Sequence, residues 1–324
     1  MVMTMRELAK LCNVSVSTVS KAFCEADDVS NETKELIFKI AKEQGCLGIY
    51  YNGKYYKKII AVICPELVSE YYTIFIEELG KLIEANDSIC VISYYNFDTD
   101  KKCELIEYFA SYLKVDGIIV IGAVNELKKG YDVPIVSVLS SSNNFADSVG
   151  TDTQSAMKEV VDTLIDYGHK KIAYIGEPLT VTKSAFFEAI MNEKNNQSHT
   201  VIQSENRFEE AGINGVKQLL KENKDYTAII CAYDRIAFGA IKELKNNGLK
   251  VPEDISVIGI DNITSSQYAE TSLTTIDTKP SDICSIAWDL LQKKLKNKYY
   301  RINQNITVKP RLIIRESIGK AKKD

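Results

Sequence analysis

The apolar residues of the first 45 positions recur at the spacing of short amphipathic helices. The first predicted helix follows Thr4, which forms a capping box with Glu7, and its core-facing residues recur at i, i+3, i+4 and i+7: Met5, Leu8, Ala9 and Cys12. The second follows the N-cap Ser15 and turns three apolar residues to the core: Val19, Ala22 and Phe23. The third follows the N-cap Ser30 and is predicted to bury four residues: Leu36, Ile37, Ile40 and Ala41. These helices predict a compact unit that ends near Gly45.

The pattern changes after residues 46–58, which we interpret as a linker. From residue 59 onward, apolar strand-like runs alternate with amphipathic helical stretches. The predicted strands are 59–64, 88–95, 116–122, 134–139, 171–176, 200–204, 227–232 and 256–261. The predicted helices lie around 72–86, 101–113, 155–167, 208–223, 235–247 and 280–298. This alternation is typical of parallel sheets with helices on both faces.

A polar stretch at 143–153 is predicted to be a loop, and it divides the alternating region into two halves. We therefore predict an α/β chain in which a three-helix domain (1–45) and a linker (46–58) precede a two-lobed region (59–324). Lobe N takes about 59–150 and 277–305, and lobe C takes about 151–276 and a C-terminal strand. Two doubly wound lobes of parallel strands predict a ligand cleft between them.

The charge distribution favours a localised contact with phosphate over general binding of nucleic acid. The chain has 324 residues and a net charge of −4, which argues against an indiscriminately basic binder. Residues 1–58 nevertheless carry nine Lys and Arg against seven Asp and Glu. A mildly basic N-terminus on an acidic body is consistent with DNA contact confined to the first domain.

Other classes of protein are disfavoured by what the sequence lacks. The eight cysteines include no Cys-x-x-Cys pair, so we expect reduced thiols and no metal site. We expect no cofactor and no enzymatic activity, because neither the glycine-rich nucleotide motifs nor a Gly-x-Ser-x-Gly nucleophile motif occurs. The sequence shows no signal peptide and no membrane-length apolar run, which favours a cytoplasmic protein over a periplasmic solute-binding module.

Several motifs along the chain occur together in one known family. The N-terminal motif consists of Ser15, the run Thr18-Val19-Ser20 and Lys21. The downstream motifs are the segments YGHKKIAYIG (167–176), AIICAYDRIAFGAIKELKNNGLKVPEDISVIGID (228–261), SLTTIDTKP (272–280) and PRLIIRES (310–317). With these motifs in this order, the chain resembles the LacI/GalR family of bacterial transcription regulators along essentially its whole length. The resemblance implies a helix-turn-helix DNA-binding domain followed by a periplasmic-binding-protein-like sensor. It also implies a repressor that binds a near-palindromic operator as a homodimer and responds to a small-molecule effector.

The family pattern assigns base contacts to three residues of the second helix. Lys21 is expected to donate to guanine, Val16 to contact a thymine methyl, and Ser17 to donate or accept a hydrogen bond. The alternatives are an internal packing contact for Val16, and a solvated lysine or a phosphate contact for Lys21. The caps Ser15 and Ser30 are candidates for phosphate contact in addition to their role at the helix ends.

The linker departs from the family, whose members carry an Ala-Arg-x-Leu hinge helix that inserts leucines into the minor groove. The aligned positions here are Asn52, Gly53, Lys54 and Tyr55, and Asn and Gly are poor residues for a helix interior. Tyr55 is the candidate for the apolar wedge. Hinge-coupled signalling is therefore in doubt on sequence grounds.

The effector cleft departs further from the sugar-responsive members. Leu139, Thr182 and Tyr233 stand where those members have Asp, Arg and Asn, whereas Asp261 keeps the hydroxyl-binding carboxylate. With Tyr72, these form the candidate effector-binding set. The changes predict a less polar cleft and argue against a standard pyranose. A more apolar or aromatic ligand, a protein corepressor, or the lack of any effector remain open. His169 is expected to have a structural role.

Overall fold

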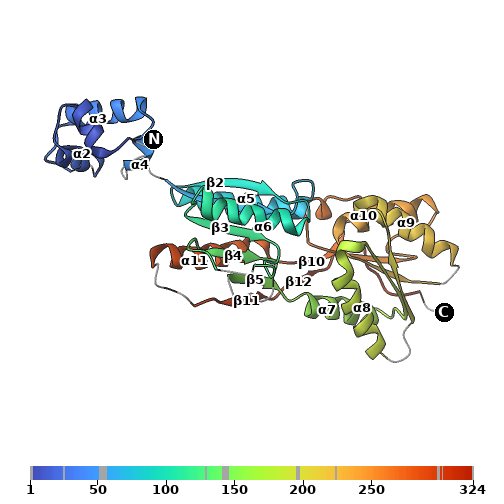
Figure 1. The fold of residues 1–324 in the computed structure, drawn as a ribbon. Coiled ribbons are helices and arrows are strands. Elements are labelled where there is room, and N and C mark those ends of the chain that lie inside the picture. The colour runs from blue at the N-terminus through green and yellow to red at the C-terminus, as the bar shows by residue number, and fades with distance from the viewer. Residues whose placement is uncertain are drawn as a thin grey trace. The chain divides into compact units, whose positions relative to one another are not determined.

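The computed structural model describes residues 3–24, 26–50, 57–127, 130–140, 146–194, 198–222, 225–297, 300 and 302–322. The chain separates into two compact units (Figure 1). The first comprises Met1–Ile59 with Asp87–Ile89, and the second comprises Ile60–Asn86 and Cys90–Asp324.

The first unit is a bundle of short helices around a small apolar core. Its helices are α1 (Met5–Leu11), α2 (Val16–Phe23), α3 (Asn31–Glu43) and α4 (Leu47–Tyr50). The predicted caps are present, because Thr4 and Glu7 form a capping box and the hydroxyl of Ser15 accepts a hydrogen bond from the amide of Thr18. The core is built from Leu8, Ala9, Cys12, Val19, Ala22, Phe23, Val29, Ile37, Ala41 and Cys46.

Two sequence expectations for this unit need correction. Leu36 was expected in the core but is 45% exposed, because the inward face of α3 is centred on Ile37 and Ala41. The short helix α4 lies within the predicted linker and adds to the core. There, the Tyr50 ring lies 5.9 Å from that of Phe23, and its hydroxyl donates to a main-chain carbonyl near the N-terminus.

Lobe N of the second unit is a six-stranded sheet in the order β11-β5-β4-β3-β1-β2. Its strands are β1 (Lys58–Cys64), β2 (Ser88–Tyr94), β3 (Gly117–Ile121), β4 (Ile135–Val138), β5 (Asp147–Thr151) and β11 (Asn305–Val308). Helices α5 (Glu70–Ala85) and α11 (Pro280–Lys296) pack together on one face of the sheet. Helix α6 (Thr99–Glu107), which continues into a π-helical turn at Tyr108–Tyr112, covers the other face.

Lobe C is a second six-stranded sheet, in the order β12-β10-β9-β8-β6-β7. Its strands are β6 (Lys171–Gly176), β7 (Ser198–Gln203), β8 (Ala228–Cys231), β9 (Ser256–Ile260), β10 (Thr274–Asp277) and β12 (Arg311–Ile313), and β12 pairs antiparallel with β10. Helices α7 (Thr153–Asp166) and α8 (Val181–Glu193) lie on one side of this sheet, and α9 (Phe208–Lys221) and α10 (Asp234–Asn246) lie on the other (Figure 1). The chain passes between the lobes after β5, after β10 and after β11.

The polar stretch predicted to be a loop contains strand β5, so that prediction is wrong for residues 147–151. The strand is buried because β4 and β11 pair with it on both sides. The carboxylate of Asp147 is neutralised by Lys294 at 2.8 Å, and Ser148 donates to the side chain of Asn305 at 2.6 Å. Polar residues are therefore compatible with a central strand here, because each finds a partner. Helix α8 was not predicted either, since its apolar residues do not gather on one face.

Within the part of the chain that the structure describes, no helix is both long enough and apolar enough to cross a membrane.

Candidate functional site

Helix α2 separates its buried residues cleanly from its outward ones. Val19, Ala22 and Phe23 are buried in the core of the first unit, whereas Val16 is 40% exposed and Ser17 and Lys21 are exposed. The three candidate base-reading residues therefore share the outward surface of one capped helix. The caps Ser15 and Ser30 are also exposed, while Tyr55 lies outside the described residues.

An acidic residue lies next to this surface of α2. Asp28, in the turn between α2 and α3, forms an ion pair with Lys21, and both side chains are about half exposed. The hydrogen bond from Lys21 lowers the pKa of Asp28 below its ordinary value. Lys21 must therefore leave or share this partner to bind any other group.

The second unit contains a cavity of about 570 Å³ between its two lobes. The cavity lies where several parallel strands of both sheets end, which is the usual position of ligand sites in open α/β sheets. Leu139 and Ser140 follow β4, Glu177 follows β6, and Asp261 follows β9. A volume of this size is typical of sites that enclose a small molecule.

All five predicted effector-binding residues line this one cavity: Tyr72, Leu139, Thr182, Tyr233 and Asp261. Leu139 has a positive φ of 60°, and its amide donates to the carbonyl of Val149 at 2.8 Å. Tyr72 comes from α5 and Thr182 from the first turn of α8, so the two lobes supply opposite walls.

Asp261 is the buried carboxylate of the cavity. It is 7% exposed, and the ammonium of Lys183 lies 3.7 Å from its Oδ1. Burial raises the pKa of Asp261 to about 6, and Lys183 limits that rise. Its buried neighbour Asp234 accepts hydrogen bonds from the hydroxyl of Thr275 and from the amide of Ile263. Burial and the charge of Asp261 keep the pKa of Asp234 well above its ordinary value.

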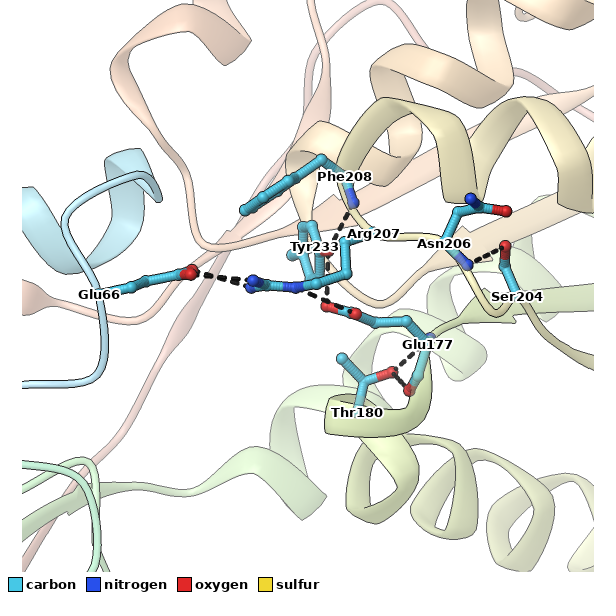
Figure 2. Close-up of polar contacts among 8 residues, drawn as sticks. All are labelled: Glu66, Glu177, Thr180, Ser204, Asn206, Arg207, Phe208 and Tyr233. Atoms are coloured by element: carbon cyan, nitrogen blue, oxygen red, sulfur yellow. Dashed lines mark hydrogen bonds and ion pairs between the residues drawn. The ribbon is translucent and has the colours of Figure 1, made fainter. Parts of the chain in front are cut away.

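A network around Arg207 crosses the cavity (Figure 2). The guanidinium donates through Nη1 and Nη2 to Glu66 of lobe N at 2.9 and 2.8 Å, and its Nε lies 3.3 Å from Glu177 of lobe C. The hydroxyl of Tyr233 donates to Glu177 at 2.7 Å and accepts from the amide of Phe208 at 3.0 Å. Glu177 also closes the turn before α8, because its carbonyl accepts from the hydroxyl of Thr180.

Sequence reasoning missed five charged residues of the cavity: Glu66, Asp152, Glu177, Lys183 and Arg207. The predicted loss of polar groups at three family positions is therefore offset by charged residues at other positions. Glu66 and Glu177 could have been found, because each comes shortly after a predicted strand. Arg207 had no such signal, since it belongs to a short connection whose path depends on the tertiary fold.

His169 and the cysteines have no part in this site. His169 is 2% exposed, with its Nδ1 2.9 Å from the hydroxyl of Thr227 and its Nε2 donating to the carbonyl of Gly319 at 3.0 Å. This is the expected structural role. The eight cysteines are free thiols. Among the residues that the structure describes, no group of three or more His, Cys, Asp or Glu is placed to hold a metal ion.

Comparison with known proteins identifies both parts of the chain. Residues 4–45 match the family model described as bacterial regulatory proteins, lacI family, and residues 161–318 match the periplasmic binding protein-like domain. The HTH-type transcriptional repressor PurR of Histophilus somni is 29% identical over 334 residues, which cover 97% of this chain and 98% of that protein.

Solved structures share the fold of nearly the whole chain. A LacI-family transcriptional regulator from Silicibacter pomeroyi has a TM-score of 0.79 at 20% identity, with 98% of this chain and 99% of that chain covered. The lac repressor dimer bound to operator and the anti-inducer ONPF has a TM-score of 0.73 at 19% identity, with coverages of 98% and 100%. At these identities, the likeness establishes the fold alone.

The predicted family and fold class are confirmed by these matches. The relatives are transcriptional repressors, so the prediction of a DNA-binding regulator rather than an enzyme is confirmed as well. The chain belongs to the lacI family of bacterial regulatory proteins.

Proposed function

We propose that this regulator represses transcription by inserting α2 into the major groove of a near-palindromic operator as a homodimer. The observation that carries the proposal is the outward face of α2, where Val16, Ser17 and Lys21 are exposed on a helix whose other face is fixed in the core. Lysine suits guanine O6 and N7, valine suits the thymine methyl, and serine serves either as donor or acceptor. The protein acts in the cytoplasm, where its DNA target lies.

The cavity between the lobes takes the effector. Its walls come from both lobes, so a bound molecule that contacts both changes the balance between lobe orientations. Tyr72, Leu139, Thr182, Tyr233 and Asp261 are the proposed contacts. The size of the cavity and its charged lining support a small molecule rather than a cleft that has lost its ligand.

The homodimer is proposed to form through the sensor unit. Lobe C carries a surface hollow of about 420 Å³ at the C-terminal end of α10, and its apolar lining comprises Phe238, Ile241, Leu249, Val251 and Ala269. Next to it lies Tyr268, which is 78% exposed. Ser265 of the same loop bonds Glu70 at the start of α5 in lobe N, close in sequence to Val68, which is 69% exposed. Exposed apolar residues on both lobes, Tyr268 and Val68, are suited to contact a second copy of this chain.

Selection of bound sequences from a random DNA pool tests the proposal. We expect a palindrome whose half-sites are about one helical turn apart. A single half-site would contradict the dimer. Failure to enrich any motif, with the protein folded by circular dichroism, would contradict sequence-specific binding.

A further inference from the structure

Arg207 occupies a cage inside the effector cavity, formed by the side chains of Glu66, Glu177, Phe97 and Phe208. We propose that this cage is a subsite for planar cations, that Arg207 is its built-in occupant, and that this occupancy ties the two lobes together. The inference rests on the proposed function only in taking the cavity to be the effector site. The ligand class that competes with Arg207 is a small molecule bearing a guanidinium or amidinium group.

The acidic part of the cage requires a cation. Glu66 is 7% exposed and Glu177 is 2% exposed, and both turn their carboxylates towards the same guanidinium. Buried carboxylates are strongly disfavoured without a charged partner. The two-pronged contact with Glu66 also selects a planar group, because it needs two parallel N–H donors.

The aromatic part of the cage reinforces this preference. The guanidinium carbon of Arg207 lies 4.5 Å from the ring centre of Phe208 and 5.2 Å from that of Phe97. Aromatic faces attract cations, and arginine in particular stacks on them. Phe97 follows β2 in lobe N, so the aromatic contacts, like the carboxylates, come from both lobes.

The same charges disfavour an anion. The two cationic side chains in the lining are each already matched to carboxylates, since Lys183 lies beside Asp261 and donates to the carbonyl of Ala232 at 2.8 Å. Arg207 contacts two carboxylates by itself. A carboxylate or phosphate ligand would therefore meet a net negative wall with no uncompensated cation to bind.

The occupant is replaceable although the cage is buried. The side chain of Arg207 is 34% exposed, so its approach to the cage is open to solvent. A free planar cation that enters the cage leaves Arg207 with a short path to water. Since Glu66 belongs to lobe N and Glu177 to lobe C, whichever cation fills the cage bridges the lobes.

Chemical rescue of the Arg207→Ala variant tests the proposal in the full-length protein. We expect this variant to have a lower melting temperature and a larger radius of gyration in solution scattering than the wild type. Methylguanidinium is expected to reverse both changes as its concentration rises, whereas methylurea, a neutral molecule of similar shape, is not. The double variant Arg207→Ala/Glu66→Gln is expected to lose the response.

Arg235→Ala is the matched control. Arg235 also stacks on Phe208, at 3.8 Å, but it pairs with Glu209 and has no role in the bridge. Rescue of this control to the same degree, or no rescue of Arg207→Ala, would overturn the proposal. Operator binding is measured on the same samples. If the wild type does not bind operator DNA specifically, the proposed function is contradicted. The rescue of Arg207→Ala by methylguanidinium still tests the cage by itself.

Discussion

Lys21 places an ammonium group on the outward face of α2, next to the carboxylate of Asp28. We expect Lys21→Ala to weaken operator binding by about 1–3 kcal/mol, because the proposed contact to guanine O6 and N7 would be lost. Titration of the operator at fixed salt measures the effect. Lys217→Ala, which removes an exposed lysine from α9 of the sensor, is the control and should leave the affinity unchanged. Unchanged affinity for Lys21→Ala would show that α2 docks in a different register.

The buried carboxylate of Asp261 makes stability depend on pH. Its pKa is about 6 in the folded protein and 3.8 in a model compound, so between these values the folded state holds a proton that the unfolded chain has lost. Stability therefore falls as the pH rises through this window, and the ionised group costs up to about 3 kcal/mol above it. Asp261→Asn is expected to be more stable than the wild type at pH 7.5, and to keep only about half of that advantage at pH 5.

Urea unfolding at both pH values measures this difference. Asp289→Asn, which changes an exposed carboxylate on α11, is the control and should show the same small effect at both values. If the stability advantage of Asp261→Asn increases as the pH is lowered, the upward pKa shift assigned to Asp261 is contradicted.

At this scale, the sequence reveals some residues of the sites and conceals others. Helix caps such as Ser15, and the outward position of Lys21, depend on local spacing and can therefore be recognised in the sequence. Arg207 and Glu66, which form a hydrogen bond, are 141 positions apart in the sequence, so no local pattern predicts their contact. Leu36 was misplaced for a related reason: a stripe of several apolar residues does not say which of two neighbours faces the core.

Helices α9 and α10 pack with their backbones in close contact. A Cβ added at Gly239 of α10 would lie 1.8 Å from the carbonyl oxygen of Glu209, and one at Gly212 of α9 would lie 2.0 Å from that of Ile236. Because the obstacle is backbone, the clash cannot be relieved by rotating a side chain. Gly239→Ala is expected to destabilise the sensor by about 3 kcal/mol, measured by chemical unfolding.

Gly80 of α5 provides the opposite case. A Cβ there meets nothing within 4 Å, so Gly80→Ala is expected to stabilise the protein by about 0.5–1 kcal/mol through the better helix propensity of alanine. If Gly80→Ala destabilises the protein as much as Gly239→Ala does, close helix packing does not explain the destabilisation by Gly239→Ala.

Helices and strands were predictable where the hydrophobic periodicity was strong. The prediction failed where pairing with other strands determines whether a segment forms a strand. The apolar strands 59–64 and 171–176 correspond closely to β1 and β6, because parallel strands buried on both faces are nearly continuous apolar runs. Strand β5 was missed because its polar residues are satisfied by distant partners such as Lys294. Strand β12, an edge strand of three residues, was anticipated only as an unplaced C-terminal strand.

At the scale of the whole molecule, the sensor's contribution to DNA binding depends on how many copies of α2 it brings to one operator. A single recognition helix makes few base contacts, whereas two on one duplex bind as a linked pair. The surface around the exposed residues Val68 and Tyr268 supplies the proposed contact between copies. Neither residue supports the core, since 69% and 78% of their surfaces are exposed, so both can be changed without unfolding the sensor.

The double variant Val68→Asp/Tyr268→Asp is therefore expected to be monomeric by analytical ultracentrifugation. Its affinity for the full palindrome is expected to fall by about 10²–10⁴, because the second half-site no longer benefits from a high effective concentration. Its affinity for an isolated half-site should match that of the wild type, because α2 is unchanged. Tyr112→Asp, at an 83% exposed tyrosine of lobe N, is the control and should remain dimeric. A double variant that stays dimeric would place the contact between copies elsewhere on the sensor, whereas a monomer with full affinity for the palindrome would show that pairing on DNA does not depend on this face.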